Sequence, residues 1–452
     1  MPDVDDALRE LIRLCLYDPA ADREAILGGL PTDVREPVGL VRSSLERNWE
    51  GRAAGIHLQE HFELPHLRTR YPDEELNFCV PESYDPAASA GLLVLLHGGG
   101  IGSPREAARR WLALEGAGDH FGDVLLEMPF ISVAPSNLLL ETHQRWSNPQ
   151  AEDYILAVVE EASYRYNVDP DRVSIHGQSM GGYGTYHLVQ TIGDRFASVG
   201  AHAGAWFYGF WEGLRGVDFY ITHGAEDARL GVRPRFTDVF FGRMASAILS
   251  GHHIPHTYRE HEGQHSFTDP LARASCLEFF EYIGGRRREA FPPEVVTASR
   301  KGAFELYPSP HFFWLTIDET HFGTFELDHI QTTEAQPSYC TTDFRHRTIR
   351  CQGGTARARN DGDNTITIET DNVYGLTLWL GREMVDFVQP VRVVINGEVW
   401  HDDVVQPSLA TALQSYARKR DPGMIFTAKL QFDLKKNDWE IVKQMAPIEP
   451  TG

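Results

Sequence analysis

The sequence has few cysteines and no pattern among them that would indicate a metal or disulfide framework. Its 452 residues contain five, at Cys15, Cys79, Cys276, Cys340 and Cys351. An odd, scattered set without ligand spacing is typical of buried, reduced thiols. A disulfide between Cys340 and Cys351 across a hairpin is an alternative. His252-His253 has no carboxylate or cysteine companions at ligand spacing, so we expect no metal and no cofactor.

Positive charge and long apolar runs are scarce as well. Asp and Glu number 64 against 42 Lys and Arg, a formal net charge of -22. Phosphate binding needs clustered basic residues, so we expect no nucleic-acid partner. No run approaches the roughly 18 to 20 apolar residues that cross a bilayer, so we expect no membrane partner. The acidic start Met-Pro-Asp-Val-Asp-Asp is unlike a signal peptide and favours the cytoplasm; a secreted protein with its leader removed is the alternative.

The length and the changing pattern along the chain predict three parts. Residues 1–54 contain two helical patterns, one over 5–17 and one after Pro37, and form a helical extension packed on the main domain. Residues 55–290 alternate strand-like and helical segments. Residues 291–452 are rich in short β segments with one helix over 409–418, and we expect an all-β, sandwich-like domain that folds separately, with its boundary near Pro292 and Pro293.

The middle part predicts an α/β fold. Leu92 to Leu96 is a continuous apolar run, as in a strand buried on both faces of a parallel sheet. Strands alternating with helices specify a mostly parallel sheet covered on both faces. The expected strands are 56–62, 76–80, 92–96, 124–126, 173–175, 197–201, 217–222 and 256–260, and the expected helices are 105–114, 151–166, 236–250 and 270–283.

A nucleophile motif lies at the centre of this part. Gly177-Gln178-Ser179-Met180-Gly181 follows a strand and precedes a helical pattern, which is the context of a nucleophile elbow. In that turn the serine hydroxyl is held clear of the backbone, and the glycines allow strand and helix to approach closely. Ser179 is therefore the candidate nucleophile.

A serine nucleophile needs a base that is itself oriented by a carboxylate. The loop after strand 217–222 offers Asp227, with Glu226 as its rival. The loop after strand 256–260 offers His265, which is better placed than the other histidines of the region, His252, His253, His256 and His261. The resulting order Ser179, Asp227, His265 follows the chain order of α/β hydrolases.

A glycine-rich loop supplies the remaining chemistry. His97-Gly98-Gly99-Gly100 ends a buried strand, and backbone N–H groups of such a loop can stabilise the oxyanion of acyl transfer where side chains would obstruct it. We expect the oxyanion donors to be Gly99, Gly100 and the N–H of Met180, the residue after the nucleophile.

The segment from about Leu92 to Ile283, a little under half of the chain, resembles the alpha/beta-hydrolase superfamily. Tyr166-Asn167-Val168-Asp169-Pro170-Asp171-Arg172-Val173 and the elbow are similar to the prolyl-oligopeptidase-like, feruloyl-esterase-like and polyhydroxybutyrate-depolymerase-like branch, and Ser179, Asp227 and His265 fall on its triad positions. His223-Gly224 before the acid also fits. The chain ahead of the sheet is too short for the β-propeller of true prolyl oligopeptidases.

These observations predict a serine hydrolase that acts on a small-molecule or polymer-derived carboxylic ester. A prolyl-oligopeptidase-like peptidase is the alternative, and a catalytically inactive hydrolase fold that serves as a binding module is a third. We expect Trp146, Trp206 and Phe207 to line the substrate pocket, which would suit an aromatic or sugar-linked substrate; aromatic clusters of this kind also occur as buried core. No oligomeric state is predicted.

Overall fold

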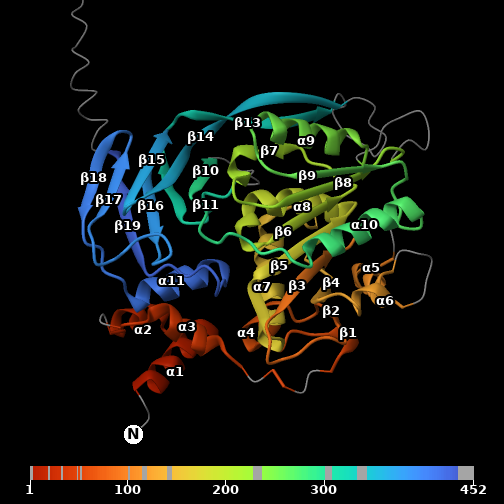
Figure 1. Ribbon diagram of the computed structural model, residues 1–452, viewed down its shortest axis with the longest axis horizontal. Helices are drawn as coiled ribbons and strands as arrows, with labels where there is room; N and C mark the ends of the chain where they lie inside the picture. Colours follow the sequence, from red (N-terminus) through yellow and green to blue (C-terminus); the bar gives the residue numbers. More distant parts are fainter. Residues whose placement is uncertain are drawn as a thin grey trace, which may run out of the picture.

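The computed structural model describes residues 4–18, 21–31, 34–47, 49–50, 53–99, 102–114, 120–139, 145–227, 237–300, 308–332 and 344–435. A large α/β region lies beside a region of β-sheets, and three N-terminal helices lie below the latter (Figure 1). Among the described helices none is both long and apolar enough to cross a membrane.

The α/β region is built on an eight-stranded sheet of order β1-β2-β4-β3-β5-β6-β8-β9. From β4 to β9 all neighbours are parallel, while β1 and β2 are antiparallel additions at one edge. The strands are β1 Gly55–Glu60, β2 Leu76–Val80, β3 Ala90–Leu96, β4 Phe130–Pro135, β5 Val168–Gln178, β6 Ser198–His202, β8 Phe219–Gly224 and β9 Thr257–His261.

Helices cover both faces of this sheet because the central strands are apolar on both sides. Along β3, Leu93 and Leu95 contribute to one core cluster together with Trp111 of α5 and Phe279 of α10. The intervening Val94 belongs to the opposite cluster, which contains residues of α7 and α8. Successive side chains of a strand point to opposite faces. Because both faces are buried here, the apolar run of β3 is continuous in sequence. The helices are α4 Pro65–Arg70, α5 Pro104–Trp111, α6 Gly122–Leu125, α7 Pro149–Arg165, α8 Met180–Thr191, α9 Phe240–Gly251 and α10 Pro270–Ile283, with 3₁₀ turns at Gly193–Arg195 and Trp211–Leu214.

One predicted strand is wrong. Residues 124–126 lie in and just after α6, where the N–H of Leu126 donates to the carbonyl of Gly122. The strand of this unit is β4, which begins at Phe130 and is buried throughout. A short apolar run fits either a strand or a buried helical turn, and periodicity does not separate the two.

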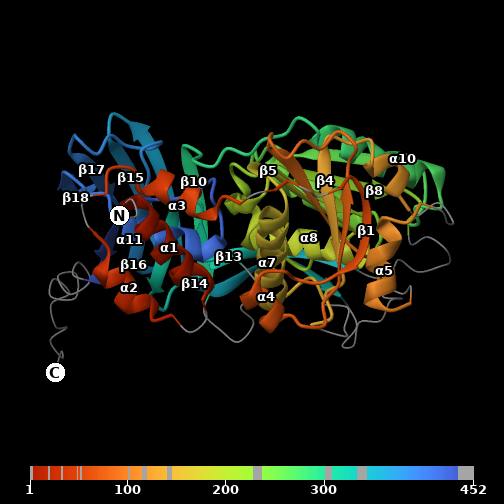
Figure 2. The same cartoon turned by 90° about the horizontal axis from the view of Figure 1, so that it is seen from below.

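The N-terminal helices pack on the C-terminal part of the chain. α1 Val4–Tyr17, α2 Arg23–Gly29 and α3 Pro37–Leu45 lie against α11 Leu409–Lys419 (Figure 2). Ile12, Val41 and Leu413 are buried in one cluster between them. The expected helical extension is therefore present, but its apolar face covers α11 rather than a face of the α/β sheet.

The C-terminal part contains two β-sheets. The larger has the order β18-β17-β15-β14-β13-β7, with β10 paired to β14, and the smaller has the order β11-β12-β16-β19. Asn396 and Gly397 have φ of 51° and 85° and form the two-residue turn between β17 and β18. The strands are β10 Glu294–Arg300, β11 His311–Phe312, β12 Leu315–Thr320, β13 Thr324–Thr332, β14 Phe344–Gly362, β15 Thr365–Asp371, β16 Val373–Leu380, β17 Val391–Ile395, β18 Glu398–Asp403 and β19 Ala428–Asp433.

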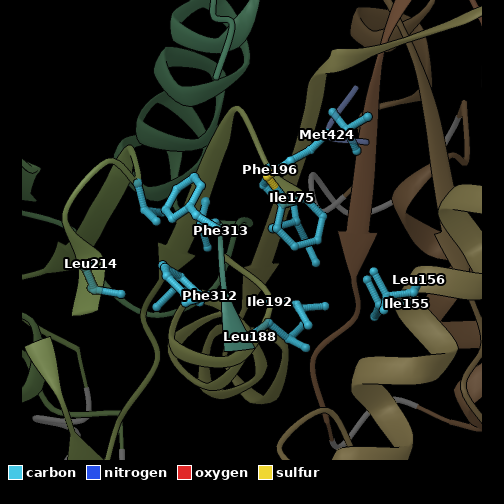
Figure 3. Close-up of a cluster of buried hydrophobic side chains, with 14 of the residues drawn as sticks. Ile155, Leu156, Ile175, Leu188, Ile192, Phe196, Leu214, Phe312, Phe313 and Met424 are labelled. Atoms are coloured by element: carbon cyan, nitrogen blue, oxygen red, sulfur yellow. The ribbon is translucent and has the colours of Figure 1, made fainter. Parts of the chain in front are cut away.

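The α/β and β regions share one hydrophobic core. Ile175 and Leu188 of the α/β region lie in the same cluster as Phe312, Phe313 and Met424 of the β region (Figure 3). Such continuous packing does not support the expectation that the C-terminal part folds separately.

Buried ion pairs join the same two regions. The Arg288 guanidinium contacts both carboxylate oxygens of Asp421, and Lys419 contacts the carboxylate of Asp194; all four side chains are less than a tenth exposed. Removing one member of such a pair leaves an uncompensated charge, so the junction resists separation.

The structure describes every cysteine except Cys340. Cys15, Cys79, Cys276 and Cys351 are buried free thiols. Cys340, the other half of the alternative disulfide, lies outside the described residues.

Candidate active site

Ser179 occupies a strained turn between β5 and α8. Its φ of 59° and ψ of -118° lie in a region that residues with a Cβ rarely adopt. The turn is held because the Ser179 N–H donates to the carbonyl of His202 at 3.0 Å and the N–H of Tyr183 donates to the Ser179 carbonyl at 3.0 Å. Strain of this kind, over-determined by its surroundings, is typical of a functional position.

Three glycines allow the strand, the turn and the helix to pack this closely. A Cβ on Gly177 would lie 2.2 Å from the Gly181 carbonyl oxygen, and one on Gly181 would lie 2.3 Å from that of Leu96. A Cβ on Gly184 would lie 2.3 Å from the Cβ of Trp146. Since these obstacles are backbone or the rigid base of a side chain, the G-x-S-x-G spacing is a packing requirement here.

The acid and base candidates meet on adjacent loops. Asp227 follows β8 and is fully buried, His265 follows β9, and His265 Nδ1 lies 2.8 Å from Asp227 Oδ2. Glu226 is exposed instead. The two loops are tied together by hydrogen bonds from Ala225 N–H to the His261 carbonyl at 2.7 Å and from Glu226 N–H to the Gly263 carbonyl at 3.2 Å.

The elbow is joined to the histidine loop directly. The side-chain amide of Gln178, the residue before the nucleophile, donates to the His265 carbonyl at 2.9 Å. This contact joins the nucleophile turn to the loop of the candidate base, and both lie at the carboxyl ends of the strands. The rival histidines have other partners or positions: His252 and His253 follow α9, and His256 contacts Ser246. His261 ends β9 near the site, but its Nδ1 accepts a hydrogen bond from the Gly263 N–H.

Two further side chains hold the Asp227 carboxylate. Thr237 Oγ1 donates to Oδ1 at 3.0 Å, and His223 Nε2 lies 3.3 Å from Oδ2. Burial alone would raise the pKa of Asp227, but the hydrogen bonds from His223 and His265 outweigh it and lower the pKa. The carboxylate is therefore ionised near neutral pH, as the partner of a charged imidazole must be.

The glycine loop after β3 contacts the nucleophile turn. A Cβ on Gly98 would lie 3.4 Å from the Ser179 Cβ, and one on Gly99 would lie 3.5 Å from Met180 Sδ. Met180 is the first residue of α8, so its N–H has no acceptor within the helix. Gly99 and Met180 are thus adjacent, as an oxyanion site requires. Gly100 lies outside the described residues.

A buried polar network fixes the position of this loop. His97 Nε2 lies 2.8 Å from the Ser136 carbonyl oxygen, and burial lowers the pKa of His97, so the ring is neutral near pH 7. Glu74 accepts hydrogen bonds from Ser136 Oγ at 2.5 Å and Tyr154 Oη at 3.0 Å. Its carboxylate thereby links Ser136, which follows β4, to Tyr154 of α7. Ser136 in turn contacts His97 through its carbonyl.

The predicted substrate-binding aromatics differ in exposure. Trp146 is fully buried and donates from Nε1 to the His97 carbonyl at 3.1 Å. Trp206 is 2% exposed and donates to the Phe241 carbonyl at 3.0 Å. Both indoles support the loops of the site from within the core and present no face to solvent. Phe207 is half-buried and packs against the core.

Sequence reasoning missed Thr237 and Glu74. Asp-Glu-Glu at 73–75 reads as an exposed charged turn, yet Glu74 is 3% exposed. Thr237 precedes a helix and carries no motif. The described residues contain no group of three or more His, Cys, Asp or Glu placed to hold a metal ion.

Comparison with known proteins agrees with the topology and the elbow. Residues 138–208 match the Prolyl oligopeptidase family. The order and directions of the strands in the eight-stranded sheet are those of the alpha/beta-hydrolase fold. A bifunctional acetylxylan esterase/xylanase of Neocallimastix patriciarum is 30% identical over 74 residues, which are 16% of this chain and 11% of the relative.

Solved structures that are similar to about half of this chain are distant from it in sequence. A ferulic acid esterase is 16% identical with a TM-score of 0.38, covering 51% of this chain and 97% of its own. A dipeptidyl peptidase 4 of Porphyromonas gingivalis is 12% identical with a TM-score of 0.36, covering 50% of this chain and 35% of its own. A thermostable esterase is 20% identical with a TM-score of 0.36, and 48% of this chain covers 60% of that esterase. Likeness at this level does not define a substrate.

Proposed function

We propose that this protein is a serine hydrolase that cleaves carboxylic esters through an acyl-enzyme intermediate. Ser179 is the nucleophile, His265 takes its proton and returns it to the leaving alcohol, and Asp227 orients the imidazole. The observation that carries the proposal is the 2.8 Å contact between His265 Nδ1 and the buried Asp227 carboxylate, on a loop bonded to the elbow. With Nδ1 engaged, Nε2 is the basic nitrogen.

The oxyanion of each tetrahedral intermediate would be stabilised by backbone N–H groups. The assignment is supported by the proximity of the two residues, because a Cβ on Gly99 would lie 3.5 Å from Met180 Sδ and Met180 directly follows Ser179. A glycine has no side chain that would obstruct an oxyanion beside it. Attack by the Ser179 oxygen expels the alcohol and leaves an acyl-enzyme. Water, deprotonated by His265, then releases the acid and restores Ser179.

An ester is favoured over an amide by the residues that surround the triad. Amide cleavage needs proton delivery to a poor leaving group and close positioning of a peptide chain. The described residues around the triad include neither a propeller-like gate nor a carboxylate pair for a peptide terminus. The partial relative that is named as an acetylxylan esterase agrees with this choice.

A fluorophosphonate reagent tests the nucleophile, because it reacts with activated serines whatever the natural substrate. We expect labelling of the wild-type protein and none of Ser179→Ala. A protein that is folded but unlabelled would instead be an inactive hydrolase fold that serves for binding, and labelling of Ser179→Ala would place the nucleophile elsewhere.

A peptidase is the second candidate, because the family match over residues 138–208 is to prolyl oligopeptidases. Comparison of kcat/KM for methyl ferulate, a soluble polyester oligomer and a proline-containing p-nitroanilide separates the two. We expect turnover of unactivated esters and little cleavage of the anilide. Efficient anilide cleavage with negligible ester turnover would overturn the ester assignment and leave the triad in place.

A further inference from the structure

Within the described residues, His265 makes two hydrogen bonds. Its ring contacts Asp227 through Nδ1 at 2.8 Å, and its backbone carbonyl accepts a hydrogen bond from the side-chain amide of Gln178 at 2.9 Å. The first bond sets the direction of the ring, and the second sets the place of the backbone from which the ring extends. Because the His265 side chain is 33% exposed, packing restrains it only in part.

Gln178 can hold this loop because its own backbone belongs to the sheet. It is the last residue of β5 and pairs with His202 of β6. It also directly precedes Ser179, whose N–H donates to the carbonyl of the same His202. The connection from Ser179 to the His265 backbone therefore consists of a single residue and a single hydrogen bond.

The same side chain lies against the glycine loop after β3. A Cβ on Gly98 would lie 3.1 Å from Gln178 Oε1 and 3.4 Å from the Ser179 Cβ. A contact of 3.1 Å is tighter than a Cβ usually makes, so the glycine leaves room for the amide oxygen. The half-buried amide of Gln178 is thus placed between the glycine loop and the histidine loop.

The other hydrogen bonds of the histidine loop act on neighbouring residues. The Gly263 carbonyl accepts a hydrogen bond from the loop after β8, and the Gln264 N–H donates to Asp269 at 3.1 Å. These bonds keep the loop folded but do not involve the backbone of His265. Loss of the Gln178 amide should therefore shift His265 without unfolding the loop.

We propose that Gln178 is a positioning residue of the hydrolase, whose amide fixes the distance between His265 Nε2 and the Ser179 hydroxyl. This role rests on the proposed ester hydrolysis. Proton transfer from serine to imidazole needs the two heavy atoms within about 2.6 to 3.2 Å of each other. A ring held by Asp227 at one nitrogen can still pivot about that contact. The bond from Gln178 supplies the second point of attachment, so that the base is held on both sides of its ring.

The test replaces the amide by an apolar side chain of the same length. Gln178→Met cannot donate, and we expect kcat for p-nitrophenyl acetate to fall by about tenfold to a hundredfold, because misplacement of a reacting group by about 1 Å has an effect of this size. KM should change by less than about twofold. Fluorophosphonate labelling of Ser179 should still reach completion, but more slowly by a similar factor. Partial labelling at the wild-type rate would show that the remaining sites are intact, and would overturn the positioning role.

Gln431→Met is the matched control. This amide of β19 donates to the Thr377 hydroxyl at 3.4 Å in the β region, and we expect its loss to leave kcat and the labelling rate unchanged. Gln178→Asn is the second variant at the site, because it stays polar but is one methylene too short to reach the His265 carbonyl. It should also be labelled slowly and completely, so the proposal remains testable if Gln178→Met fails to fold.

A double-mutant cycle separates positioning from a general effect on the fold. In Asp227→Asn the imidazole has already lost the carboxylate that orients it, so the bond from Gln178 no longer secures a productive geometry. We expect Gln178→Met to lower kcat by less than about threefold in that background, against tenfold or more in the wild type, because residues that act as a unit are not additive. Equal factors in the two backgrounds would overturn the proposal.

The positioning role and the proposed function can fail separately. A wild type that is labelled at Ser179 and hydrolyses the ester, with kcat and labelling rate unchanged in Gln178→Met, would overturn the positioning role alone. A folded wild type that is neither labelled nor active on the ester would overturn the serine-hydrolase assignment, and the role of Gln178 with it.

Discussion

The α/β region and the β region differ in how their residues are related to function. In the α/β region, short segments carry the motifs of the proposed chemistry: Ser179 with its glycines, and Asp227 and His265 after the ends of successive strands. In the β region no segment has such a motif, and its residues are joined to the α/β region by contacts made over long sequence separations. A catalytic motif is local in sequence, whereas an interface between two regions is a product of packing.

The largest effect should come from the acid of the triad. Asp227→Asn keeps the size of the side chain but removes the charge that orients His265, and we expect kcat to fall roughly 10⁴-fold. Glu226→Gln changes the neighbouring exposed residue and should alter kcat less than threefold. Steady-state kinetics on one ester decides between them. The reverse ranking would make Glu226 the acid and overturn the assignment of Asp227.

The second-largest effect should be a loss of stability when the buried Arg288–Asp421 ion pair between the two regions is broken. Asp421→Asn leaves the buried Arg288 with the partly exposed Asp171 as its remaining acidic partner, and we expect the free energy of unfolding to fall by about 3 kcal/mol. Asp402→Asn breaks the exposed Arg392–Asp402 pair of the β region and should cost less than about 1 kcal/mol. Urea unfolding monitored by circular dichroism and fluorescence should show one transition for the wild type. Two separate transitions would show that the regions fold independently after all.

A smaller effect is expected from pH. Burial lowers the pKa of His176 to about 3, whereas an unfolded histidine has a pKa of about 6.5. Between these values the unfolded chain binds a proton that the folded chain does not, so stability falls as the pH decreases, by up to about 1.4 kcal/mol per pH unit for this group.

His176→Gln should reduce the pH dependence of the unfolding free energy between pH 6.5 and 4, whatever its effect on stability at pH 7. It should not abolish the dependence, because burial also lowers the pKa of His202. Denaturant titrations across this range measure the slope. An unchanged slope would show that His176 takes up its proton without unfolding.

The smallest effect should come from the network beneath the oxyanion loop. Glu74→Gln replaces one acceptor oxygen by an NH₂ group, which donates and cannot accept hydrogen bonds. The network with Ser136 and Tyr154 is then weaker, and the loop that contains His97 is held less firmly. We expect kcat to fall by about tenfold, with KM nearly unchanged, because oxyanion contacts act in the transition state. Glu82→Gln, an exposed carboxylate nearby in sequence, is the control. A rise in KM alone would place Glu74 in substrate binding instead.

The sequence predicted the parallel sheet and the three residues that the structure brings to one edge of it, because these depend on strand order and on motifs within a few residues. It did not separate a strand from a helical turn at 124–126, since three apolar residues suit both. Trp146 was expected in the pocket, but burial is set by Gly184 and His97, which are far away in sequence. The packing of Phe344 could not be predicted, because its ring partners Phe240 and Phe241 lie on α9, far away in sequence.

Pairing of β7 with β13 also has a consequence for biosynthesis. His329, which binds the Phe207 carbonyl, lies 122 residues further along the chain. At a translation rate of roughly 5 to 20 residues per second, the ribosome takes about 6 to 24 s to reach it. During that interval the loop after β6 and the first turn of α9 expose the aromatic surface that Phe344 later covers. The nascent chain therefore acquires its nucleophile motif well before the β region covers these rings, and it is a candidate client for chaperones that bind apolar segments.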